Sequence, residues 1–344
     1  MKHFLSLGLF LLSLYAGCAR ADSANNSLFQ KSMTEPSFFS TDLMAMGIIA
    51  TRQEETEYLP EIKGDLYAWQ EESVELRFRT RMQENQLSFG IEQGRIEQKN
   101  LFFHDTDFDL DRRSVAVGWE RVWSPTLSSA LSVRCEEYAD HDGQSYYRLG
   151  HDKQLWTGQA ILRYRQPSWW GELSYSRERD PEPVYDLISD RAALNLRAQE
   201  LTGINLGWLW NREWETVAGL YYEAYGSHRP DQLNYTVQTL YRPLGFKELT
   251  AALGAGYYTE EQETIVNLTL RYSKTLSQQL ALEGEYQLEY SDDEQSWLNQ
   301  GLASVRWKIA AAWQLRGTIE YSRESGEDRD ESLLLLAQLD YLFD

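Results

Sequence analysis

Histidine and aspartate are the side chains of this sequence that could together carry out acid–base chemistry. His104 is followed directly by Asp105, and His228 is a second imidazole that could lie near this pair. A histidine and a carboxylate that share a water molecule can activate it for hydrolysis. Histidines and acids occur together by chance in many surface loops, however. We therefore predict that the protein is not an enzyme and keep a hydrolase as the least favoured alternative.

Four aspartates alternate with other residues at Asp105, Asp107, Asp109 and Asp111. Several hard carboxylate oxygens are the ligands that Ca²⁺ prefers. The segment lacks the glycine and the terminal glutamate of a helix–loop–helix calcium site. The simpler interpretation is an acidic surface loop that is solvated or attracts divalent cations. No Cys-x-x-Cys-His haem motif or Cys/His cluster is present, and we predict no bound cofactor.

Arginine and glutamate form a third set of candidate residues, because they alternate with apolar residues along extended segments. Fixed charges that line a pore select ions and solutes. Alternatively, the same charges pair with one another and fill an interior without selecting anything. The candidate pore-lining residues are Arg77, Arg79, Arg163, Arg165, Arg271, Glu283, Glu285, Glu289, Arg306, Arg316 and Glu320.

The elements that carry these charges read as long β-strands. From about residue 73 onward, apolar and polar residues alternate in segments of roughly nine to thirteen, as where Val74, Leu76 and Phe78 alternate with Glu75 and Arg77. A period of two gives a strand one apolar and one polar face. Segments of about 9–11 residues suit a strand that crosses a bilayer, and aromatic residues near their ends suit its two interfaces. We predict an all-β, closed antiparallel transmembrane β-barrel, with a soluble sandwich as the alternative.

Composition excludes several other classes of protein. The 344 residues include 12 Trp, 21 Tyr and 12 Phe, which a disordered chain would lack. Beyond the N-terminus there is no apolar run long enough for a membrane-spanning helix. The net charge of −20 disfavours a nucleic-acid partner, because phosphate contacts require clustered lysine and arginine.

The N-terminus indicates export. Residues 1–21 have a positive start, an apolar stretch and a final Ala19, Arg20 and Ala21, which together predict a signal peptide. The alternative is a lipoprotein signal that acylates Cys18. Cleavage after Ala21 leaves Cys135 as the only cysteine, so the mature fold has no internal disulfide. We expect residues 22–42 to be a periplasmic lead-in and residues 43–344 to be the barrel.

Loop alternation gives a strand number. Short periplasmic turns must alternate with long extracellular loops, and this count gives about 16 strands, with 14 as the alternative. The first strand is expected near residues 43–51. Residues 177–202 then have to be one extracellular excursion, in which Ser189 could start a short helix or an ordered loop segment and Gly203 could end it. We expect this excursion to fold inward and narrow the channel.

The C-terminus resembles the last strand of bacterial outer-membrane barrels. One apolar face continues to the end of the chain at Leu335, Ala337, Leu339, Tyr341 and Phe343, although the final residue is Asp344 and not an aromatic. The resemblance implies the outer membrane of a Gram-negative cell. It also implies as partners the barrel assembly machinery, outer-membrane lipid and lipopolysaccharide, whose phosphates the acidic loop could bridge through divalent cations.

A second resemblance runs from about residue 171 to the end, through GELSYSRERDPEPVYD, LNYTVQTLYRPLGFKELTAALGAGYY and LDYLF. This order is similar to the transmembrane barrels of exopolysaccharide secretion proteins. It implies a conduit for a hydrophilic solute or a polysaccharide, with a separate periplasmic scaffold as partner. The alternatives are a structural or adhesive barrel and a sheath for a multihaem electron-transfer protein.

Overall fold

The fold is described here from a computed structural model. The described residues run from 44 to 343, except for 60–63, 101–107, 142–146, 150–153, 187–190, 225–230, 260–261, 293–294 and 326–328. The expected signal peptide and periplasmic lead-in lie outside the described residues.

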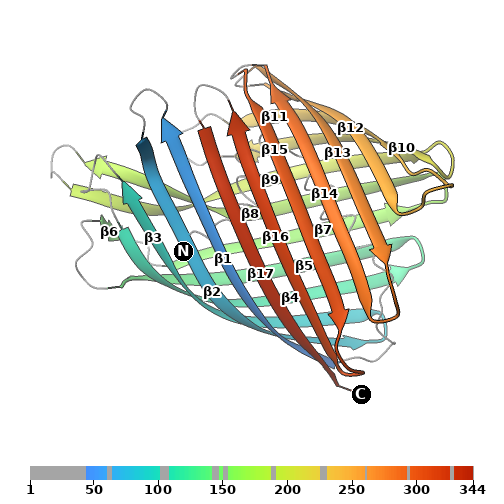
Figure 1. Cartoon of the computed structure of the whole chain (residues 1–344), viewed down its shortest axis with the longest axis horizontal. Helices are drawn as coiled ribbons and strands as arrows, with labels where there is room; N and C mark the ends of the chain where they lie inside the picture. The colour runs from blue at the N-terminus through green and yellow to red at the C-terminus, as the bar shows by residue number, and fades with distance from the viewer. Residues whose placement is uncertain are drawn as a thin grey trace.

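Sixteen antiparallel strands form one closed barrel, in which each strand pairs with its neighbours along the chain (Figure 1). The expected fold class and the preferred strand number are therefore confirmed. Among the described residues, no helix is long and apolar enough to cross a membrane. The barrel strands are β1 (Met44–Leu59), β2 (Gly64–Met82), β3 (Asn85–Asn100), β4 (Phe108–Ser124), β5 (Leu127–Asp140), β7 (Gln154–Arg165), β8 (Trp169–Asp186), β9 (Arg191–Leu209), β10 (Trp214–Ala224), β11 (Gln232–Tyr241), β12 (Leu249–Tyr258), β13 (Glu263–Thr275), β14 (Leu280–Ser291), β15 (Trp297–Lys308), β16 (Trp313–Ser325) and β17 (Arg329–Phe343).

The first and last strands close the barrel. β1 pairs with β17 from Met44 opposite Phe343 to Tyr58 opposite Arg329. Both ends of the barrel sequence therefore lie at the same end of the cylinder, which we call the terminal end. The opposite end, where β1 connects to β2, is called the loop end.

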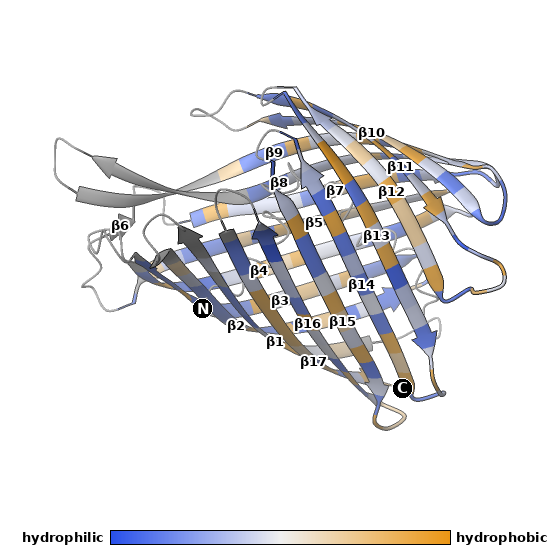
Figure 2. Cartoon of the chain, turned by 45° about the horizontal axis from the view of Figure 1, so that its top comes forward, coloured by the Kyte–Doolittle hydropathy of each residue, from blue (hydrophilic) through white to orange (hydrophobic). Residues whose placement is uncertain are grey.

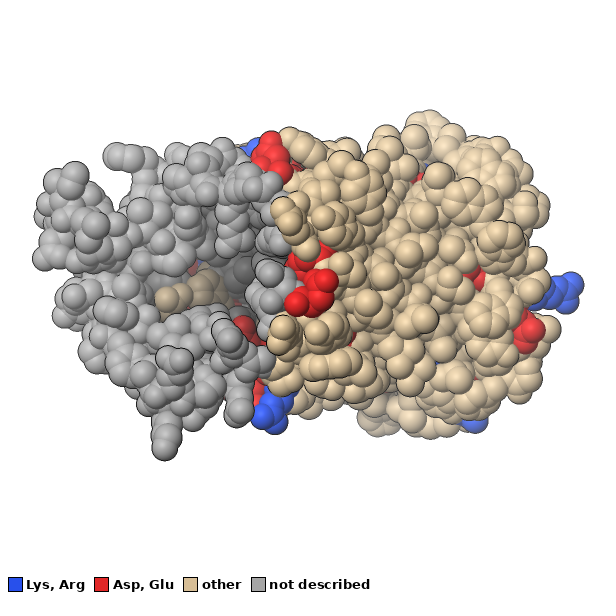
Figure 3. Space-filling view, turned by 90° about the horizontal axis from the view of Figure 1, so that it is seen from above, with Lys and Arg blue, Asp and Glu red and all other residues tan. Residues whose placement is uncertain are grey.

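Side chains alternate between the outside and the inside along every barrel strand. On β2, Val74 is 53% exposed, whereas its neighbour Glu75 is 3% exposed. The large exposed side chains are apolar on strand after strand, and most buried side chains are polar or charged. Figure 2 shows the resulting bands of hydropathy, and Figure 3 shows a side of the barrel whose described surface is predominantly uncharged. The apolar face of each strand is thus the outer face.

Aromatic side chains gather near both ends of this outer face. At the terminal end, the rings of Trp214 and Tyr241 lie 4.5 Å apart. At the loop end, the rings of Tyr290 and Trp297 lie 4.8 Å apart. Two such girdles mark the interfaces of a bilayer, where an aromatic ring meets both hydrocarbon and water.

The structure corrects one expectation about the 177–202 excursion. Its described residues, 177–186 and 191–202, form no helix. They belong to β8 and β9, which pair continuously from Trp169 opposite Trp208 to Asp186 opposite Arg191 and so continue the barrel wall instead of folding inward. A three-residue strand, β6 (Tyr147–Leu149), adds a parallel pairing to β9. The helix prediction was wrong because β8 and β9, at 18 and 19 residues, are longer than a bilayer requires. Their loop-side halves therefore no longer show the apolar alternation of a lipid-facing strand.

Candidate functional site in the barrel interior

All of the candidate pore-lining residues occupy inward positions of their strands. They alternate with exposed apolar residues, as Arg77 and Arg79 do with Phe78, and as Glu320 does with Ile319 and Tyr321. Glu289 and Glu320 are buried, while Arg79 and Arg165 are exposed near the terminal end. These residues thus lie on the inner face of the barrel, and their role as pore-lining residues stays a prediction.

Arginine–glutamate pairs line the terminal half of the interior. Most of them join neighbouring strands, which is the arrangement that the pairing alternative describes. Arg163 and Glu172 are only 12% and 6% exposed, so this pair is largely withdrawn from water. The nitrogen–oxygen distances are 2.7 Å for Arg77–Glu75, 2.7 Å for Arg163–Glu172, 2.6 Å for Arg242–Glu215, 2.8 Å for Arg271–Glu285, 3.1 Å for Arg306–Glu283 and 3.8 Å for Arg316–Glu283.

These pairs neutralise much of the charge on the wall, because each guanidinium lies against a carboxylate. Removing one member of a buried pair leaves the other charge unpaired and costs about 3–5 kcal/mol. Arg79 and Arg165 differ from the paired arginines: they have no ion-pair partner among the described residues. Both side chains are therefore available to act on a solute at the terminal end.

A buried charged cluster occupies the wall formed by β2–β5. Arg112 of β4 is 1% exposed and lies 2.8 Å from Glu71 of β2, with Glu92 of β3 as its second carboxylate. Glu92 also accepts a 2.6 Å hydrogen bond from Arg134 of β5 and a 2.8 Å bond from Ser114. Arg112 thus bridges two carboxylates with one nitrogen each, and such charge-assisted hydrogen bonds are stronger than those between neutral groups. The cluster ties four strands together near the loop end.

Sequence reasoning missed this cluster, although its members follow the alternation used for the other strands. Arg112 and Ser114 alternate with Arg113 and Val115, so their inward position could have been inferred. What the sequence does not reveal is that Arg112 and Glu71 meet across the intervening strand β3. The inward residues Glu172, Glu215 and Arg242 were missed in the same way.

The candidate metal ligands do not form a metal site in the described part of the chain. Asp109 pairs with Arg95 on the outer face, and Asp111 lies 2.9 Å from Nδ1 of His141. No group of three or more potential ligands occurs among the described residues. Asp105, Asp107 and the histidines His104, His151 and His228 lie outside the described residues.

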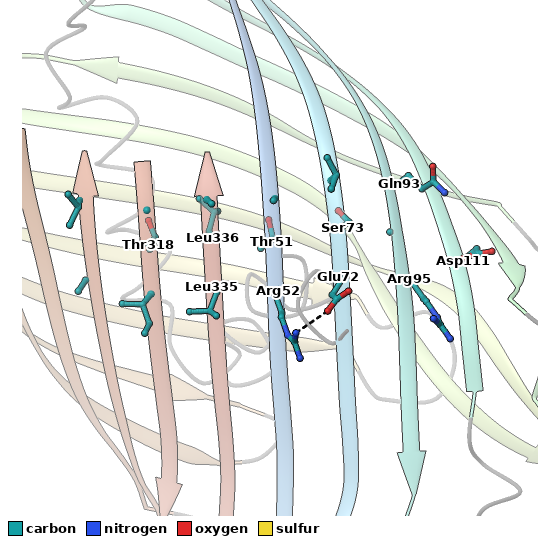
Figure 4. A pocket seen from close by; sticks show the side chains of 18 residues that line it. Thr51, Arg52, Glu72, Ser73, Gln93, Arg95, Asp111, Thr318, Leu335 and Leu336 are labelled. Atoms are coloured by element: carbon teal, nitrogen blue, oxygen red, sulfur yellow. Dashed lines mark ion pairs between the residues drawn. The ribbon is translucent and has the colours of Figure 1, made fainter. Parts of the chain in front are cut away.

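A groove of about 820 Å³ crosses the outer wall from β15 to β4. Its floor is apolar and includes the small residues Ala50, Gly317 and Ala337. Toward the loop end, Arg52 and Glu72 form a 3.3 Å ion pair at its edge (Figure 4). Because it is an outward surface at the level of the apolar belt, this groove faces lipid and not the channel.

A closed sixteen-stranded barrel with an apolar outside and a charged inside is an outer-membrane β-barrel. No family model matches the sequence, and no curated protein matches it. Among solved structures, the fold is similar to a bacterial polysaccharide outer membrane secretin, with 10% identity, 89% of this chain and 100% of that chain covered, and a TM-score of 0.51. OccK11 (OpdR) of Pseudomonas aeruginosa gives 11% identity, coverage of 88% and 96%, and a TM-score of 0.46. OccAB4 of Acinetobacter baumannii gives 9% identity, coverage of 90% and 100%, and a TM-score of 0.44.

Proposed function

We propose that this protein is a passive channel that carries a hydrophilic solute, or an exopolysaccharide chain, across the outer membrane. The observation that carries the proposal is the division of side chains between the two faces of a closed barrel. Apolar residues such as Val74 and Ile319 face outward, and charged residues such as Glu75 and Glu320 face inward. Barrels of sixteen strands are wide enough to enclose an aqueous channel.

The orientation follows from the ends of the barrel sequence. Barrels of this kind have short turns on the periplasmic side. The connection between Met82 and Asn85 and that between Ser124 and Leu127 are two residues each, and both lie at the terminal end. The terminal end therefore faces the periplasm. A solute that leaves the cell would meet Arg79 and Arg165 near this mouth.

The exopolysaccharide form of the proposal has two supports of its own. It is supported by the resemblance of residues 171–343 to secretion barrels and by a polar interior, and the likeness to the solved secretin concerns the fold alone. In this form a separate periplasmic scaffold would deliver the polymer. Barrel assembly machinery and lipopolysaccharide are proposed partners of either form.

Single-channel recording in planar bilayers tests the channel. Purified full-length protein should give discrete current steps in 1 M KCl, and no such steps should appear with heat-denatured protein. A folded barrel that passes no current at any voltage or salt concentration would contradict the proposal. For the exopolysaccharide form, deletion of the gene should abolish a secreted polymer, and complementation should restore it.

A further inference from the structure

Unpartnered amide groups line one part of the barrel interior. Gln199 of β9, Gln232 and Asn234 of β11, and Asn267 of β13 are all inward and at least nine-tenths buried. Within the described part of the chain, no hydrogen-bond partner is found for Nε2 of Gln199, Oε1 of Gln232, both side-chain polar atoms of Asn234 and Oδ1 of Asn267. Thr269 of β13 adds an unpartnered hydroxyl. We call these five residues the amide wall.

The members of the amide wall lie on β9, β11 and β13, and the strands β10 and β12 lie between them. Gln232 lies opposite Glu223 of β10, which lies opposite Leu201 of β9, two residues from Gln199. On the other side, Asn234 lies opposite Tyr258 of β12. Gly254 of β12 then lies opposite Asn267, and a Cβ atom at this glycine would stand 2.7 Å from the Asn267 Oδ1 atom. Neighbouring strands are about 4.8 Å apart, so the wall from β9 to β13 is roughly 19 Å wide.

These atoms require a partner of defined chemistry. A buried amide without a hydrogen bond is unfavourable, and nearly all such groups in native proteins are paired with protein, water or ligand. The unpartnered atoms include both donors, at Gln199 and Asn234, and acceptors, at Gln232, Asn234 and Asn267. A partner must therefore both donate and accept hydrogen bonds, as hydroxyl groups do.

The neighbouring residues of the wall disfavour an anion. Glu223 is inward on β10, Glu263 is inward on β13, and Glu289 is inward on β14, opposite Asn267. A polyanion would be repelled by these carboxylates. The opposite arrangement occurs around Glu92, where polar groups of β2–β5 bind one another. The interior thus has a charged cluster on β2–β5 whose groups contact one another, and, on β9, β11 and β13, amides without a hydrogen-bond partner among the described residues that lie between carboxylates.

We propose that the amide wall binds an uncharged, hydroxyl-rich chain, which is the chemistry of a neutral oligosaccharide. This inference rests on the proposed channel function and specifies the class of solute. Amides that donate and accept to successive hydroxyls would hold such a chain weakly enough for it to move along β9–β13.

Maltohexaose, a neutral oligosaccharide, is the probe for the test. It should interrupt the single-channel current, and polyethylene glycol of equal size and an anionic oligogalacturonate should do so much less. Asn234→Leu and Gln232→Met should each weaken the maltohexaose block by about twofold to tenfold, the effect of one ordinary hydrogen bond. Gln300→Met is the matched control, because this buried inward amide already donates a 2.5 Å hydrogen bond to Glu320. Heat-modifiable migration on gels confirms that each variant is folded.

The outcomes separate this inference from the channel itself. Current steps with no preference for maltohexaose over polyethylene glycol would overturn the amide wall as a sugar site and leave the channel intact. A block that the amide variants do not weaken would overturn it as well. If no current is seen, calorimetric titration of maltohexaose into detergent-solubilised protein decides the inference: binding that Asn234→Leu weakens supports it, and no binding overturns it.

Discussion

Trp170 Nε1 donates a 2.6 Å hydrogen bond to Glu215 Oε1, so that an indole on β8 reaches a carboxylate on β10 across β9. The intervening residue is Gly207, and a Cβ atom added there would collide with the indole ring. Glu215 also accepts a 2.6 Å hydrogen bond from Arg242. Trp170 packs with Val217 and Leu240 in an apolar patch on the inner face. Through its bond to Glu215, this patch is connected to the arginine–glutamate pairs of the terminal half. The absence of a side chain at Gly207 makes this contact sterically allowed.

Gly207→Ala should therefore destabilise the barrel by about 1–3 kcal/mol, because overpacking displaces Trp170 and weakens its bond to Glu215. The measurement is urea unfolding of the protein folded into lipid vesicles. Gly301→Ala is the control, since nothing lies within 4 Å of a Cβ atom at that position. Equal effects of the two substitutions would show that the ring of Trp170 is free to move aside.

Arg112→Met should lower the free energy of unfolding strongly, although the substitution changes the side-chain volume little. It would leave Glu71 and Glu92 buried without the guanidinium that contacts both, at a cost of about 3–5 kcal/mol in the free energy of unfolding. Arg79→Met removes an exposed arginine of the same interior and should change stability little. Replacing Glu71 as well, by Gln, should recover part of the loss. If Arg112→Met and Arg79→Met unfold at the same urea concentration, the buried contacts of Arg112 do not stabilise the barrel.

The unpaired arginines at the terminal end should influence ion selectivity. Replacing Arg79 and Arg165 together by Glu should shift the reversal potential in a KCl gradient toward cations, because fixed charges at a mouth attract counter-ions. The shift should shrink as the salt concentration rises, since screening shortens the reach of each charge. Arg113→Glu changes the charge of an exposed outward residue and should leave the reversal potential unchanged. A shift of the same size with Arg113→Glu would point to the surface and not to the channel.

The sequence predicts the barrel well because its main signal, a period of two, survives wherever a strand has lipid on one side. Arg163, Arg271 and Arg306 were assigned inward from this alternation alone, and each occupies an inward position paired to a neighbouring strand. The same signal fails beyond the bilayer, which is why the alternation does not predict the loop-side part of β9 as a strand. Contacts such as Arg112–Glu71 depend on the register of three strands, and no local sequence pattern predicts that register.

The assignment of inward and outward faces can itself be tested through Cys135. On β5 it lies opposite Val115 and Trp156, which are 46% and 57% exposed, whereas its neighbour Glu136 is buried inward. The thiol therefore faces lipid. A charged water-soluble thiol reagent should modify it at least about tenfold more slowly than an exposed cysteine, because charge partitions poorly into hydrocarbon.

The matched variant carries Cys135→Ser and Ser132→Cys, which moves the thiol to an exposed inward position of the same strand. This thiol should react rapidly with the water-soluble reagent if the interior contains water. A fluorophore on Cys135, but not one at position 132, should be quenched by spin-labelled lipid. If the fluorophore at position 132 were quenched by lipid and Cys135 reacted rapidly with the water-soluble reagent, the two faces of β5 would be assigned the wrong way round. Arg134 and Glu136 would then face outward. A third outcome is slow reaction at both positions with quenching only at position 135. It would confirm the assigned faces but show that the interior is closed to water at this level, which would contradict the open channel.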